Sequence, residues 1–236
     1  MMNDIIVLNN SAILCLQHGN FNDAFNIMIQ ASRIMFLVTQ DTPSNARRKN
    51  RDCNIAWTRI RVDEREPTND TKIDESPTIY PYAPTLIKPC CQNAFSTERI
   101  CCTNCEDDSN VYPINLAPVV SFNLGLCCQL LGSDVGYHTR EGSLYLNQAT
   151  CLYEKVFRSC RSNWPSHGLS TMKMAVLNNQ GGIFFQMGKQ DACLNAMECM
   201  SDILASISQS FLCQKWGTFY LNLKLLHASS CPAAAA

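Results

Sequence analysis

The chain has 236 residues, a net charge of −1 and only 17% charged residues, while 46% of its residues are hydrophobic. This composition is long and apolar enough to bury a sizeable core, and it excludes a chain that is disordered throughout. A nearly neutral chain is not expected to present a polyanion-binding surface over the whole molecule. We therefore expect no nucleic-acid partner.

Cysteine is frequent, with 15 residues, and the odd number leaves at least one thiol unpaired. The first residues lack the basic segment and long apolar run of a secretory signal. These features predict a reducing, cytoplasmic compartment in which most cysteines are small apolar core residues.

The longest stretch without a charge, 109–133, contains two prolines and several polar residues. A membrane-spanning helix needs about 20 predominantly apolar residues. The stretch therefore favours a loop followed by a buried helix, and we expect no membrane span.

One short pattern occurs three times: Asn, any residue, a small residue and, seven positions later, Gly. The copies are Asn10-x-Ala12 with Gly19, Asn123-x-Gly125 with Gly132, and Asn179-x-Gly181 with Gly188. Each copy is followed by a small, a large and a small or apolar residue at helical spacing: Ala24, Met28 and Ala31, then Ala149, Tyr153 and Val156, then Cys193, Met197 and Met200.

This arrangement predicts pairs of antiparallel helices that approach closely at the small residues and turn at the glycine. After the first pair, helices are expected near 115–131 and 143–160, and near 170–187 and 190–207. The stretch between Gly132 and Ala149 is longer than its counterparts, which predicts an inserted loop in the second pair.

The first copy resembles the tetratricopeptide-repeat (TPR) family at Ala12, Gly19, Phe21, Ala24, Met28 and Ala31. The third copy departs from the family at Gln190, where an aromatic residue belongs, and no copy has the closing proline. The resemblance implies an all-α fold of antiparallel helix-hairpin repeats in a right-handed superhelix.

The pattern divides the chain into repeats, an insertion and a terminal helix that would cap the last repeat. The ranges are a first hairpin at 1–38, an insertion at 39–113, a second hairpin at 114–161, a third hairpin at 168–208 and a capping helix at 209–228.

The insertion changes character along its length. From 40 to 76 it is polar and charged, which predicts mostly disorder. Two short strands are expected at 85–88 and 99–103, as a small β-hairpin. The basic run at 47–51 has the composition of a nuclear-import signal, although a solvated linker is favoured.

The insertion also carries a cysteine cluster: Cys90, Cys91, Cys101, Cys102 and Cys105. Its single C-x-x-C spacing suits a zinc site, but adjacent cysteines in a strand point to opposite faces. We predict no metal and no cofactor. The alternative is a zinc-stabilised or thiol-redox module using Cys91, Cys102 and Cys105, and metal analysis of the purified protein separates the two.

By the resemblance, the first helix of each pair lines a concave groove that binds a partner. The predicted binding residues are Ile6, Asn9, Ile13, Leu16, Gln17, Phe122, Leu126, Gln129, Asn178, Phe185 and Gln186. The set is apolar with a few amides and no charge, which favours a peptide or helix of a partner protein over a small-molecule substrate. We expect a non-enzymatic scaffold. The alternative is that these residues pack against the insertion or the C-terminal helix.

Overall fold

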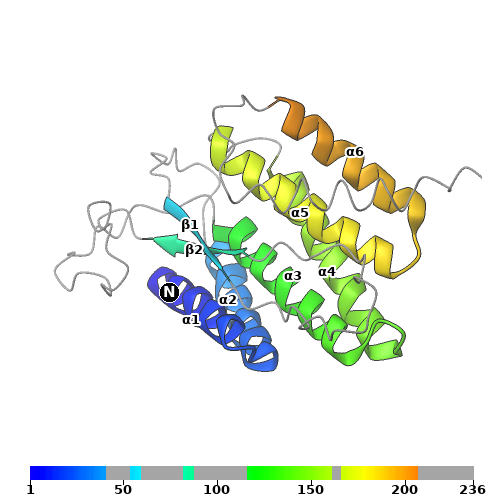
Figure 1. Cartoon of the computed structure of the whole chain (residues 1–236). Helices are drawn as coiled ribbons and strands as arrows, with labels where there is room; N and C mark the ends of the chain where they lie inside the picture. The colour runs from blue at the N-terminus through cyan, green and yellow to red at the C-terminus, as the bar shows by residue number, and fades with distance from the viewer. Residues whose placement is uncertain (41–53, 60–81, 88–115, 161–165, 207–236) are drawn as a thin grey trace, which may run out of the picture.

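The computed structural model describes residues 1–40, 54–59, 82–87, 116–160 and 166–206 (Figure 1). The described elements are α1 (Met2–Gln17), α2 (Phe21–Gln40), β1 (Asn54–Arg59), β2 (Tyr82–Ile87), α3 (Leu116–Val135), α4 (Arg140–Ser159), α5 (Ser166–Gln186) and α6 (Gln190–Ser206). Apart from one two-stranded ribbon, this part of the chain is helical, which confirms the all-α prediction. The predicted helix at 209–228 lies outside the described residues.

The helices are arranged as three antiparallel pairs, α1–α2, α3–α4 and α5–α6. The second helix of each pair packs on the first helix of the next, so that α2 contacts α3 and α4 contacts α5. Figure 1 shows the pairs following one another across the molecule, from α1–α2 at one end to α5–α6 at the other.

The small-large-small stripe forms the contact within each pair. All of its members are at most 5% exposed: Ala24, Met28, Ala31, Ala149, Tyr153, Val156, Cys193, Met197 and Met200. The small residues let the backbones approach, and the large ones fill the space between turns. The prediction of these packing faces is confirmed.

Two of the three predicted turn glycines end a helix. Gly19 and Gly188 have φ angles of 76° and 68°, in the left-handed region that a glycine enters without a side-chain clash. After α1, the amide of Asn20 donates to the carbonyl of Cys15 over 2.9 Å, and the equivalent bond after α5 is 2.8 Å long. Both turns therefore have the hydrogen bond of a Schellman C-cap.

The third prediction, a turn at Gly132 followed by an inserted loop, is wrong. Helix α3 continues through Gly132, and the turn glycine is Gly136, with a φ of 93°. The loop spans only 136–139, so the additional residues lengthen both helices of this pair. Gly132 is small for another reason: an added Cβ would lie 2.9 Å from the side chain of Leu146. A spacing pattern does not distinguish a turn glycine from one at a close helix contact.

Helix α4 begins at a side-chain cap that the longer hairpin supplies. The Thr139 hydroxyl accepts a hydrogen bond from the amide of Gly142 over 2.9 Å and donates to the carbonyl of Gly136 over 2.8 Å. An N-cap threonine satisfies one of the free amides of the first turn, so the sharp loop and the helix start are stabilised together.

Helix α3 has the length and apolar composition that a membrane-crossing helix requires, and it is the one helix of the described ranges that does. However, 83% of that apolar window is buried inside the protein. Helix α3 contacts α1, α2, α4 and β2. Its apolarity is therefore explained by its central position in the helical core.

The predicted β-hairpin is correct for one strand and wrong for its partner. Strand β2 overlaps the predicted strand at 85–88, but it pairs antiparallel with β1, from Asn54 opposite Ile87 to Arg59 opposite Tyr82. Strand β1 falls in the stretch predicted to be disordered, and the predicted strand at 99–103 lies outside the described residues. A strand gains its hydrogen bonds from a distant segment, so the polar composition around β1 gave no sign of the pairing.

We expect Gly125→Ala to lower the free energy of unfolding by about 1–3 kcal/mol, because an added Cβ would lie 2.9 Å from the ring of Tyr153. Gly182→Ala is the matched control, since a Cβ there meets no described atom within 4 Å. The control should gain up to about 1 kcal/mol from its lower unfolded-state entropy. Urea denaturation of both variants measures the difference, and equal effects would contradict the close contact.

Candidate binding surface on the first helices

The predicted binding residues lie on the first helix of each pair, but most of them are inside the folded protein. Those exposed by at most 1% are Asn9, Ile13, Leu16, Phe122, Leu126, Gln129 and Asn178. Ile6, Gln17 and Gln186 are partly buried, and Phe185 is 37% exposed. Phe185 is therefore the one member of the set with an exposed side chain.

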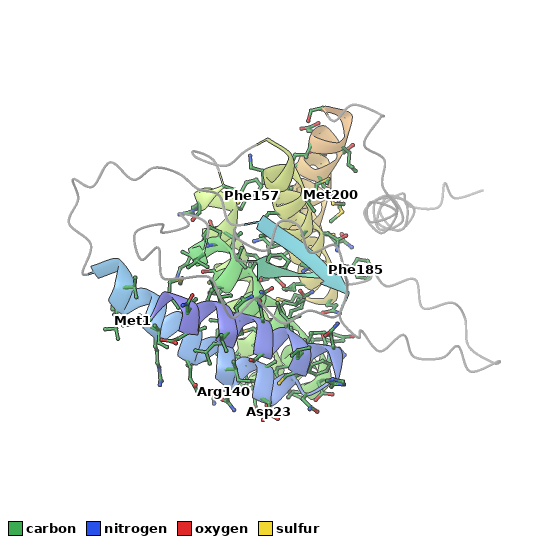
Figure 2. The ribbon with its side chains drawn as sticks, turned by 90° about the vertical axis from the view of Figure 1, so that its left-hand side faces the viewer. Met1, Asp23, Arg140, Phe157, Phe185 and Met200 are labelled. Atoms are coloured by element: carbon green, nitrogen blue, oxygen red, sulfur yellow. The ribbon has the colours of Figure 1, made fainter. Side chains whose placement is uncertain are left out.

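Part of the chain itself lies on this surface. Strand β2 contacts both α1 and α3, the first helices of the first two pairs (Figures 1 and 2). The insertion between those pairs thus returns across the surface that the sequence assigned to a partner. This is the arrangement that the alternative interpretation, packing against the insertion, anticipated.

Buried amides join the first two pairs. The Nδ2 of Asn123 on α3 donates to the Oδ1 of Asn9 on α1 over 2.9 Å, and both side chains have 0% exposure. A buried amide hydrogen bond adds modest stability when it is made and costs more when one partner is removed. It therefore fixes how α1 and α3 lie against each other.

A second polar group joins α3, α4 and α5 around the hydroxyl of Tyr153. This hydroxyl donates to the Oε1 of Gln129 over 2.9 Å and accepts from the Nδ2 of Asn179 over 3.2 Å. The Nε2 of Gln129 also donates to the backbone carbonyl of Asn179 over 3.4 Å. Burial raises the pKa of Tyr153 well above its usual value, so the hydroxyl keeps its proton and continues to donate.

The described cysteines are free thiols, and most of them are core residues. Burial raises the pKa of Cys128 to about 12 and that of Cys160 to about 11, and it raises that of Cys127 well above the usual value. The thiolate is the reactive and metal-binding form. These buried thiols therefore keep their protons near neutral pH.

Within the described ranges, no group of three His, Cys, Asp or Glu side chains gathers closely enough to hold a metal ion. The cluster from Cys90 to Cys105, including the alternative ligands Cys91, Cys102 and Cys105, lies outside those ranges, as does the basic run at 47–51. The alternative of a zinc or thiol-redox module stays a prediction.

The chain matches no protein-family model, no curated protein and no solved structure. The resemblance to TPR repeats therefore depends on the residues of this chain alone.

Sequence reasoning missed the polar contacts between pairs. The repeated Asn was part of the pattern, and at Asn123 and Asn179 it reaches back to the preceding pair. The recurrence of this Asn at equivalent positions in three copies was the available signal that it makes a contact between pairs. The acceptors, Asn9 and Tyr153, come from different helices, and only the fold brings them into reach.

We expect Tyr153→Phe to lower the free energy of unfolding by about 1–3 kcal/mol, because it leaves buried amide groups of Gln129 and Asn179 without the hydroxyl. Urea denaturation measures this loss. Tyr137→Phe removes a hydroxyl from a side chain that is 41% exposed and should have almost no effect. A loss of similar size in both variants would show that the buried contact contributes nothing specific.

The raised pKa values predict that the protein loses stability in alkali. An unfolded cysteine has a pKa of about 8.5, whereas the pKa of folded Cys128 is about 12. The contribution of protonated Cys128 to the free energy of unfolding is fully present below the pKa of the unfolded state. It is lost as the pH rises toward the pKa of the folded state, by up to about 1.4 kcal/mol per pH unit.

Urea denaturation between about pH 8 and about pH 10 tests this expectation. Cys128→Ala should reduce the slope of stability against pH, and Cys151→Ala, at an exposed position, should leave it unchanged. An unchanged slope in Cys128→Ala would contradict the raised pKa.

Proposed function

We propose that the chain is a non-enzymatic protein-interaction scaffold whose TPR-like helix pairs form a right-handed superhelix. The surface on its first helices, α1, α3 and α5, binds an extended or helical segment of a partner protein. The proposal extends the internal repeat of the sequence to the geometry of the repeat family that it resembles, which is an argument by analogy.

The observation that carries the proposal is the position of β2. This strand lies against α1 and α3, so the surface already holds an extended polypeptide segment. A partner segment would use the remaining part on α5, around Phe185, or would replace β2. The described candidate residues carry no charge, so the recognised segment is expected to be apolar.

The chemistry of the thiols supports a non-enzymatic scaffold in a reducing compartment. The described cysteines are free, as expected where thiols stay reduced. Because the pKa values of the buried ones are raised, they are protonated near neutral pH and are poor nucleophiles.

Affinity capture from native lysate, with quantitative mass spectrometry, compares wild type with Phe185→Lys. The exposed ring tolerates a charge without burying it, whereas Ile13, at 1% exposure, would not. We expect a small set of proteins to be depleted at least about tenfold in the variant, the equivalent of about 1.4 kcal/mol of binding.

Leu144→Lys is the matched control, because Leu144 is 54% exposed and lies on α4, which is the second helix of its pair. Circular dichroism and thermal melting confirm that both variants fold. If wild type and Phe185→Lys capture the same proteins, or none, the α5 surface is not the binding site.

A further inference from the structure

Strand β2 matches in chemistry the surface on which it lies. It contacts two of the first helices, α1 and α3 (Figures 1 and 2). Its residues, 82–87, have the sequence Tyr-Ala-Pro-Thr-Leu-Ile and carry no charge. The predicted binding residues on the first helices carry no charge either. An uncharged extended segment on an uncharged surface leaves no charge desolvated without a partner.

Burial differs between the helices that β2 contacts and the third one. On α1 and α3, four of the apolar candidate residues are at most 1% exposed: Ile13, Leu16, Phe122 and Leu126. On α5, which has no contact of similar extent with β2 among the described elements, Phe185 is 37% exposed. The exposed apolar part of the candidate binding surface thus lies beyond the helices that β2 contacts.

The helix pairs contact one another directly and not only through the strand. Helix α2 packs on α3, and the 2.9 Å hydrogen bond between Asn123 and Asn9 joins α3 to α1. Residues 60–81 connect β1 to β2, and residues 88–115 connect β2 to α3. Connections of this length allow the strand to leave the surface without moving a helix.

The pairing of β2 with β1 is a weak hold on the strand. The two strands form a two-stranded sheet, and such a ribbon is marginally stable by itself. Pro84, which lies opposite Trp57 in the register, has no amide hydrogen and removes one donor from the strand. The position of β2 therefore depends on its contact with α1 and α3, and a segment that competes for these helices would displace it.

We propose that β2 is an intramolecular occupant of the binding surface, which it blocks and whose partner segment it resembles. This role rests on the proposed function and names the partner class: an extended, uncharged segment that contains proline, as 82–87 does. Tethering gives β2 an effective concentration of about a millimolar at the surface. The chain therefore binds its partner weakly until β2 is displaced.

Fluorescence anisotropy with a labelled peptide of residues 80–88 tests the proposal on the full chain. In one variant, alternating Gly and Ser replace 82–87. The control carries the same replacement at 68–73, in the insertion but outside the ribbon, where the net charge does not change. A peptide of the same composition in scrambled order controls for unspecific binding.

We expect the peptide to bind the 82–87 variant with a Kd of about 100 µM. Wild type and the control should bind it about tenfold more weakly, because a tethered competitor at about a millimolar raises an apparent Kd of that size by this factor.

Thr85→Pro/Leu86→Pro is a second variant that changes β2 less. Successive amides of a strand point to opposite edges, so one of the two removed donors faces β1. This variant should also bind the peptide more tightly than wild type does. Circular dichroism and thermal melting check that the helices of every variant are intact.

Equal binding of the peptide by wild type and the folded variants, or no binding to either variant, would overturn the proposal. Affinity capture from lysate separates this result from the proposed function. Proteins captured equally by wild type and the 82–87 variant, with a peptide that does not discriminate, would overturn the block by β2 and leave the proposed function standing. A peptide that discriminates, with no protein captured by either form, would support the block by β2 and overturn the proposed function.

Discussion

Tyr153 is the contact on which the packing of the second and third helix pairs depends. Its ring lies against Gly125 on α3, where a Cβ would not fit, and its centroid is 5.5 Å from that of Phe122. Its hydroxyl joins Gln129 to Asn179 and so reaches from α3 to α5. One side chain thus sets the spacing within the second pair and the position of the third pair on it.

Because Tyr153 and the Asn9–Asn123 bond fix the pairs relative to one another, the first helices present a surface with a defined shape. Strand β2 crosses α1 and α3 of that surface. An isolated two-stranded ribbon is marginally stable at best in water. Its position therefore depends on the helices beneath it, and the candidate binding surface follows from the same buried polar contacts.

The sequence predicts what is local and periodic in this fold. The small-large-small stripes and the turns at Gly19 and Gly188 follow from spacing, because one helical face and one left-handed residue need only nearby positions. The prediction at Gly132 fails because a glycine at a close contact has the same spacing as a turn glycine. Its partner, Leu146, lies across the hairpin, and only the packed pair distinguishes the two roles.

The candidate binding surface shows the same division between local features, which the sequence predicts, and packing, which only the fold decides. Sequence periodicity places Ile13 and Phe122 on the first helices, but their burial depends on elements far along the chain, and β1 shows no local pattern that predicts its pairing with β2. The valines that stand three positions before each repeated Asn extend the argument. Val7, Val120 and Val176 occupy equivalent positions, yet one is exposed and two are buried, because exposure depends on the neighbouring helix pair rather than on the residue. Sequence thus specifies the chemistry of a helix face, and the neighbouring helix pair decides whether that face is buried.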